Sequence, residues 1–200
     1  MKKSRLEAFS DGVLAIIITI MVLELPVPHA TTLAALWPLW PKFLCYAMSF
    51  VYIGIYWNNH HHLWQAVEHV NGRVLWANLH LLFWLSLVPF ATDWMGENQF
   101  AAAPVAVYGV VLLAAGCAYY VMAQVLLASH APDSVLARAL GRDFKGRASI
   151  VIYAVAIVAA FRLPWLSGLL YGLVAVIWLV PDSRFERLLD GGERRAARRT

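Results

Sequence analysis

The sequence predicts an all-α integral membrane protein, built as one bundle of six transmembrane helices. Hydrophobic residues make up 61% of the 200 residues and charged residues only 14%, which is far from the composition of soluble proteins. A spanning helix needs about 20 mostly apolar residues, and six stretches approach that length. Lys and Arg gather in alternate connections between these stretches. We therefore expect a single six-helix domain over residues 1–200, with a basic tail from about residue 182.

Each expected span is an apolar run with polar or charged residues at its borders. The first run follows a basic N-terminus, and the last precedes a tail rich in Arg. The fifth and sixth runs are separated only by Arg162 and Pro164, where proline disfavours a continuous helix. The spans are expected at Leu6 to Leu25, Trp37 to Asn58, Arg73 to Met95, Ala101 to Leu127, Arg147 to Phe161 and Leu163 to Val180.

The positions of Lys and Arg predict the orientation, because short cytoplasmic loops retain positive charge. Of the 16 Lys and Arg, only Lys42 and Arg162 fall on one side of the expected spans, and the other 14 fall on the opposite side. Both termini are therefore expected in the cytoplasm. The formal charge of +4 needs no nucleic-acid partner, since topology accounts for it and the tail can meet anionic lipid headgroups.

Two features of the sequence admit other interpretations. The basic N-terminus followed by an apolar run resembles a secretory signal peptide, but Glu7 and Asp11 interrupt the run and residues 28–30 are a poor cleavage site, so we favour a retained helix. Cys45 and Cys117 both lie within expected spans, where thiols usually pack. We expect neither a disulfide framework nor a redox site.

The first span is unusually polar for a membrane helix, and ionisable groups inside spans are functional candidates. Acidic residues in its first turns can also simply stabilise the positive end of the helix dipole. Further along, helical spacing places Ile16, Ile20 and Leu23 on one stripe, with Thr19 at its edge. Such a stripe is suited to close an oligomeric pore, although an apolar stripe in a membrane more often faces lipid or packs.

Arg5, Phe9, Ser10 and Asp11 form a motif in which Phe-Ser-Asp follows Arg after three residues. The stretch that contains them, RLEAFSDGVLAIIITIMVLEL, resembles the first helix of the transmembrane protein 175 family, the endolysosomal potassium channels and their bacterial relatives. The stretches YWNNHHHLW and NLHLLFWLSLVPFATDWMGE also look like that family. The resemblance covers the first three spans well and the last three only through hydropathy.

This resemblance implies a channel for potassium and other monovalent cations, located in a bacterial cell membrane and formed by a homotetramer. The first helices of the four subunits would surround the pore, with Ile16 at the constriction, Ile20 and Leu23 further outward, and Thr19 as a ring of hydroxyls. Arg5, Ser10 and Asp11 would tie the cytoplasmic end of the helix to its neighbours through Trp57, Asn59 and His60, because polar groups in a membrane must pair internally. No cofactor is implied.

The histidines suggest a rival function. His60, His61, His62 and His69, with Glu68, are residue types that bind first-row metals, and a metal-dependent or lipid-handling membrane enzyme would use them. No His-Glu-x-x-His motif occurs, however, and the seven-residue spacing of His62 and His69 needs a third element, so we favour hydrogen bonding and expect no metal. A secondary transporter is a further rival, but no inverted repeat is visible.

Overall fold

The computed structural model describes residues 2–179 except 68, 132–133, 135 and 138–143, and every regular element in this part of the chain is a helix. The all-α prediction is thereby confirmed. Only Leu87 separates the third helix from the fourth, so the pair makes one interrupted crossing and the described helices make six. In chain order they are α1 Lys3–Leu23, η1 Leu33–Leu39, α2 Trp40–Gln65, α3 Gly72–Ser86, α4 Val88–Glu97, α5 Ala102–Ala128, α7 Phe144–Ala160 and α8 Pro164–Leu179.

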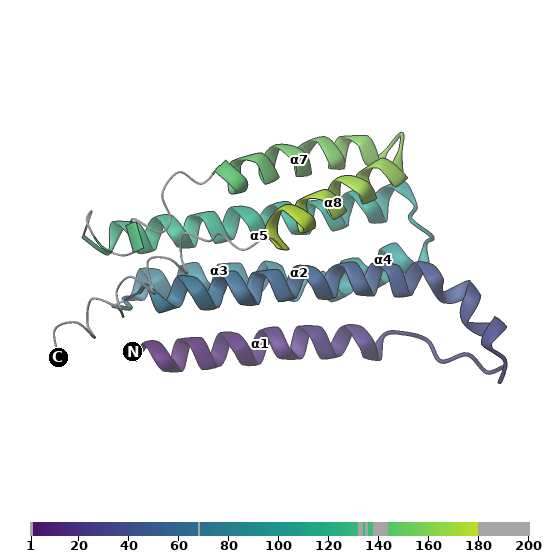
Figure 1. Ribbon diagram of the computed structural model, residues 1–200, viewed down its shortest axis with the longest axis horizontal. Coiled ribbons are helices and arrows are strands. Elements are labelled where there is room, and N and C mark those ends of the chain that lie inside the picture. The colour runs from purple at the N-terminus through teal and green to yellow at the C-terminus, as the bar shows by residue number, and fades with distance from the viewer. Residues whose placement is uncertain (1, 68, 132–133, 135, 138–143, 180–200) are drawn as a thin grey trace, which may run out of the picture.

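The helices lie side by side in layers, with α1 at one edge of the bundle and α7 at the other (Figure 1). α1 packs against α2, α3 and α4, while α5 packs against α3, α4, α7 and α8. The short helix η1 extends beyond the bundle on the side of α1 (Figure 1). α1 therefore has neighbours on only one side, which leaves its other face uncovered within this chain.

The second and third crossings differ most from the spans that the sequence predicts. α2 begins at Trp40 after the 3-10 helix η1, and it continues to Gln65 instead of ending at Asn58. The polar run from Asn58 to His62 ends the apolar stretch but not the helix, because these side chains leave the backbone ladder intact. The third span is interrupted at Leu87, just before Pro89, whose ring lacks the N–H that a continuous helix needs.

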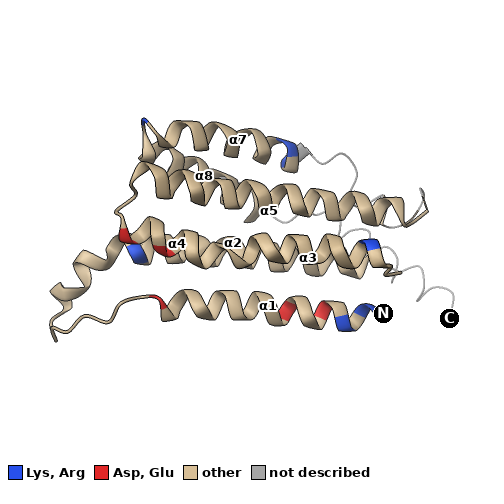
Figure 2. Ribbon diagram, turned by 180° about the vertical axis from the view of Figure 1, so that it is seen from behind, with Lys and Arg blue, Asp and Glu red and all other residues tan. Residues whose placement is uncertain are grey.

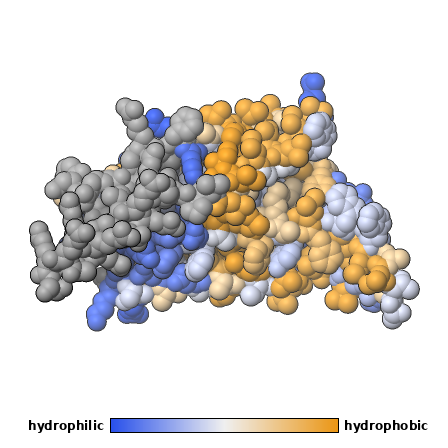
Figure 3. Space-filling view, in the orientation of Figure 1, coloured by the Kyte–Doolittle hydropathy of each residue, from blue (hydrophilic) through white to orange (hydrophobic). Residues whose placement is uncertain are grey.

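Length and apolarity alone mark three helical stretches as able to cross a membrane, at Lys3–Leu23, Gly72–Glu97 and Ala102–Ala128. Pro164–Leu179 is apolar but shorter. Figure 3 shows apolar residues over the middle of one face and hydrophilic residues gathered towards the end where α1 begins. This pattern is typical of a bundle whose middle lies in the hydrocarbon layer.

The charged residues lie at the two ends of the bundle (Figure 2). Lys3 and Arg5 belong to the start of α1 and Arg73 to the start of α3, whereas Lys42, near the start of α2, bonds Glu97 of α4 at 2.9 Å. The described basic residues thus follow the expected distribution. Arg138, Arg142 and the tail from residue 182 lie outside the described residues.

Close packing of α5 against α8 depends on Gly109. A Cβ atom at this position would overlap the Tyr171 hydroxyl and lie 2.8 Å from Ile157 Cγ1. The Tyr171 hydroxyl is fixed, because it donates to the Val105 carbonyl at 3.1 Å. The absence of a side chain at Gly109 therefore lets α5, α7 and α8 meet.

We expect Gly109→Ala to destabilise the fold by about 1–3 kcal/mol, the usual cost of inserting a methyl group into a packed core. Gly168→Ala in α8 is the matched control, because a Cβ there meets nothing within 4 Å. Thermal unfolding of the detergent-solubilised protein measures both. Equal melting temperatures for the two variants would contradict this account of the α5 packing.

Candidate pore face and polar network

α1 has one face inside the bundle and one face outside it. The buried face consists of Leu6, Ser10, Leu14, Ile17 and Met21, at helical spacings of three and four. On the opposite face Ile16 is 58% exposed and Leu23 80% exposed, whereas Ile17 is only 4% exposed. The structure therefore leaves Ile16, Thr19, Ile20 and Leu23 uncovered within one chain, as the sequence stripe predicts.

Thr19 adds the polar group of this face. Its Oγ1 atom is 3.0 Å from the carbonyl oxygens of both Ala15 and Ile16, so its hydrogen is directed into the α1 backbone. Since a hydroxyl has one hydrogen and two acceptor lone pairs, the oxygen still has acceptor capacity on the exposed side. Thr19 can therefore present oxygen to a cation.

An open groove runs beside this face, between α1 and α4. Ile16 and Ile20 line it from α1, and Pro89 and Phe90 line it from α4. Phe90 is 64% exposed although it is large and apolar. The groove is therefore uncovered within one chain, where lipid or another subunit can fill it.

At the opposite end of α1, an indole from α2 binds the carboxylate of the Phe-Ser-Asp motif. Trp57 Nε1 donates to Asp11 Oδ1 at 3.1 Å. The Trp57 ring also stacks on His61, with centroids 6.1 Å apart. Asp11 thereby fixes α1 to α2 near the end of the bundle that carries the basic residues.

A second, buried network starts at Ser10 of the same motif. The Ser10 hydroxyl donates to Leu6 O at 2.9 Å and accepts from Asn78 Nδ2 at 3.0 Å. Asn78 Oδ1 lies 2.8 Å from His60 Nε2, and Trp64 Nε1 lies 2.7 Å from the same nitrogen. One ring nitrogen holds one hydrogen or none, so it donates to Asn78 or accepts from Trp64. The network joins α1, α2 and α3.

Three of the expected motif residues stand outside these networks. Asn59 donates to Ile55 O of its own helix at 2.8 Å, so it does not bind α1. The Arg5 side chain is exposed and has no hydrogen bond or ion pair with the described residues. Phe9 is 52% exposed. Asn78, which the sequence argument did not single out, occupies the central place. The sequence feature that could have identified Asn78 is an amide side chain within an otherwise apolar stretch.

The histidines are not arranged around a common point. His60 belongs to the buried network, and His61 Nε2 lies 2.9 Å from Gln65 Nε2. His62 Nδ1 is buried without a partner in the described part of the chain. No group of three His, Cys, Asp or Glu residues that could hold a metal occurs among the residues described, and Glu68 lies outside them. The geometry gives the metal hypothesis no support.

We expect Trp57→Phe and Asp11→Ala to lower stability by a similar amount, about 1 kcal/mol each, because both remove the same partly exposed hydrogen bond. Arg5 contributes little to this loss, since it does not pair with Asp11 in the chain as described. The double variant should melt at nearly the same temperature as either single variant. Additive losses in thermal unfolding would show that the two side chains act separately.

The fold and the site together describe a membrane protein of six helical crossings, whose first helix carries a Phe-Ser-Asp motif at one end and an uncovered apolar face. Residues 5–89 match the model of the family described as "Endosomal/lysosomal potassium channel TMEM175". This match includes the Phe-Ser-Asp motif and the interruption of the third crossing at Leu87.

Whole-chain relatives extend the match. "Potassium channel HX13_20290" of a Chryseobacterium strain is 54% identical over 189 residues, which cover 94% of this chain and 98% of that protein. A crystal structure of a lysosomal potassium-selective channel TMEM175 homologue from Chamaesiphon minutus matches with a TM-score of 0.76 and 29% identity, over 89% of this chain and 96% of that one. The chain belongs to the TMEM175 family.

A vertebrate relative shows a more limited match. "Endosomal/lysosomal proton channel TMEM175" of Gallus gallus is 34% identical over 109 residues, which are 48% of this chain but only 22% of that protein. The family is one of channels and not of enzymes, so the hypothesis of a metal-dependent or lipid-handling enzyme is wrong.

Proposed function

We propose that this chain is one subunit of a homotetrameric potassium channel, in which the four α1 helices surround the pore. The single observation that supports this most is the uncovered face of α1, where Ile16 is 58% exposed while Ile17, its neighbour in sequence, is 4% exposed. This face also carries the Thr19 hydroxyl and lies beside the groove between α1 and α4, which distinguishes it from a face that only meets lipid. Four copies bring the bare faces together on one axis.

Conduction through this pore depends on wetting. A narrow ring of Ile16 side chains cannot replace the hydration shell of an ion, so it excludes water and ions until it widens. Ile20 and Leu23 extend the apolar lining outward, and Thr19 supplies oxygen between them. The chain has no Thr-Val-Gly-Tyr-Gly loop to form a carbonyl filter. Selectivity for potassium over sodium therefore arises from pore width and the Thr19 oxygens, and it is weaker than in a carbonyl cage.

The polar networks hold the pore helix at its motif end. Trp57 binds Asp11 from α2, and Asn78 binds Ser10 from α3. Both bonds restrict rotation of α1 about its own axis, which keeps Ile16 on the pore and Ile17 in the bundle. We propose that this end, with both termini, lies on the cytoplasmic side of a bacterial cell membrane, because short cytoplasmic loops retain positive charge.

The names of the relatives suggest two candidate permeant ions, potassium and the proton. The bacterial relative is named as a potassium channel, and the chicken relative as a proton channel. We favour potassium, because the match to the bacterial relative covers nearly the whole of both chains.

Flux into liposomes tests the proposal. The purified protein is reconstituted with potassium inside and sodium outside, and a pH-sensitive dye reports proton entry in parallel. We expect potassium flux above sodium flux, and a particle of four chains by light scattering in detergent. Conduction by a monomer would contradict the shared pore, and proton flux without potassium flux would contradict the choice of ion.

A further inference from the structure

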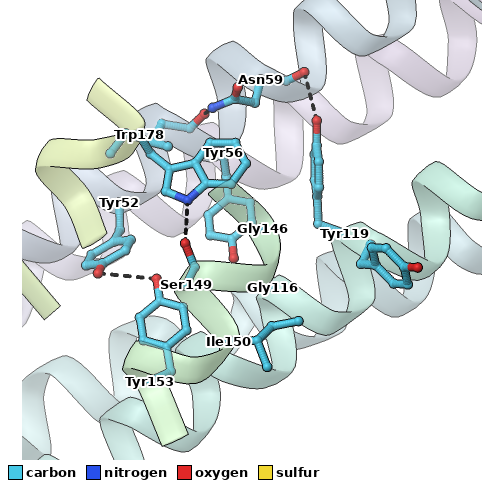
Figure 4. Close-up of a pocket in the computed structure, with 12 residues that line it drawn as sticks. Tyr52, Tyr56, Asn59, Gly116, Tyr119, Gly146, Ser149, Ile150, Tyr153 and Trp178 are labelled. Carbon is cyan, nitrogen blue, oxygen red and sulfur yellow. Dashed lines mark hydrogen bonds between the residues drawn. The ribbon is translucent and has the colours of Figure 1, made fainter. Parts of the chain in front are cut away.

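A cavity lies on the side of the bundle away from α1, among α2, α5, α7 and α8 (Figure 4). Leu179 is the last described residue of α8, and Trp178 lines the cavity next to it. The cavity is lined by Tyr52, Ile55, Tyr56, Asn59, Gly116, Tyr119, Tyr120, Gly146, Ser149, Ile150, Tyr153 and Trp178.

The shape of the cavity suits a slender apolar ligand. About 570 Å³ is free of protein atoms, partly open to the outside, but a water-sized sphere can be centred in only about 50 Å³ of it. An extended acyl chain is a narrow apolar ligand that suits a space in which a water-sized sphere has so little room. Gly116 adds no side chain to the cavity wall. A Cβ atom at this position would lie 3.9 Å from both Tyr56 Oη and Tyr153 Cε2.

Some polar side chains of the cavity are hydrogen-bonded to one another, and one is not. Trp178 Nε1 donates to Ser149 Oγ at 2.9 Å, and Tyr153 Oη bonds Tyr52 Oη at 3.3 Å. The Tyr56 hydroxyl points into the cavity (Figure 4) and makes no hydrogen bond with the described residues. It can therefore donate to a carbonyl oxygen of a ligand.

Among the described residues, the charge next to the cavity is positive. Arg147 is exposed one residue after Gly146 of the lining, at the end of the bundle where Lys3, Arg5 and Arg73 also lie (Figure 2). Tyr120, which is 37% exposed, and Trp178 flank the same region, as aromatic residues do at a membrane interface. Basic and aromatic side chains around a crevice between helices favour an anionic lipid headgroup.

We propose that this cavity is a binding site for an anionic phospholipid of the adjacent leaflet. One acyl chain occupies the space between α2, α5 and α7, the Tyr56 hydroxyl donates to an ester carbonyl, and Arg147 faces the phosphate. The site lies across the bundle from the pore face, so the proposal does not depend on the proposed pore. Bound lipid fills the cavity and holds α2 against α7.

Native mass spectrometry of the protein, exchanged into equal amounts of phosphatidylglycerol and phosphatidylcholine, tests the site. We expect phosphatidylglycerol to be retained preferentially by the wild type. Arg147→Gln should reduce that preference about fivefold, corresponding to roughly 1 kcal/mol for one basic residue at a membrane surface. Arg162→Gln, an exposed arginine at the opposite end of α7, is the matched control and should leave it unchanged.

The depth of the site is tested with Gly116→Val, which places methyl groups inside the cavity, and with Gly168→Val, where a Cβ meets nothing within 4 Å. We expect the first variant to lose retained phosphatidylglycerol and the second to keep it. If Gly116→Val fails to fold, Gly116→Ala makes the same test with only ordinary contacts. Retention equal to the wild type in the folded Gly116 variant would overturn the proposal, as would equal effects of Arg147→Gln and Arg162→Gln.

Discussion

Replacing Ile16 with Asn should raise cation flux by about tenfold or more, equivalent to lowering the conduction barrier by about 1.4 kcal/mol. The amide wets the narrowest apolar ring of the proposed pore, so ions keep their water as they pass. The same change should weaken the preference for potassium over sodium, because a wetter ring discriminates less by width. Liposome flux with the two ions on opposite sides measures both effects.

The neighbouring isoleucines provide the matched controls. Ile17 is buried in the bundle, so Ile17→Asn should cost about 2–5 kcal/mol of stability without opening a pore. Ile18 is partly buried and packs against the core, so Ile18→Asn should also impair packing and not conduction. Higher flux from Asn at position 17 or 18, with none from position 16, would place another face of α1 on the axis.

Replacing Asn78 with Leu should destabilise the protein by about 1–3 kcal/mol and loosen the attachment of α1. Asn78 is fully buried, and its amide bonds both Ser10 Oγ and His60 Nε2. Leu has a similar size but forms neither hydrogen bond, so the links from α3 to α1 and to α2 are lost, at about 0.5–1.5 kcal/mol for each bond. Thermal unfolding and the yield of assembled channel measure the effect.

Asn98→Leu is the control for this change, because Asn98 is exposed and bonds only the Trp94 carbonyl of its own helix. It should be nearly neutral. Adding Ser10→Ala to Asn78→Leu should change stability little further, since the Ser10 hydroxyl has then already lost its partner on α3 and bonds only Leu6 O of its own helix. A melting temperature of Asn78→Leu equal to that of Asn98→Leu would show that the buried amide does not hold α1.

The faces of α1 could be predicted from the sequence because they depend only on local geometry. Once residues 3–23 are helical, the angle of 100° per residue separates Ile16 from Ile17 whatever surrounds them. The six crossings were likewise predictable from apolar runs. The end of α2 was not, because hydropathy reports where a helix meets water and not where its hydrogen-bond ladder stops.

The partners of the motif depend on how neighbouring helices are rotated and shifted, which no local pattern determines. Trp57 bonds Asp11 of α1, and His60, three residues later, bonds Asn78 of α3. Asn59 lies towards α5 instead, where Tyr119 Oη is 3.4 Å from its carbonyl oxygen. Asn78 lies 68 residues from Ser10 in sequence, so their contact emerges only when α3 packs against α1.

Because the number of crossings is even, a tandem duplicate of this unit would keep the orientation of the first copy. α1 starts at one end of the bundle, and α8 runs back towards that same end (Figure 1). A second copy joined after the first by a short connector would therefore begin on the same side of the membrane and insert in the same orientation. Tandem duplication of this unit conserves its polarity without any change to its charged residues. A unit with an odd number of crossings would insert its second copy upside down.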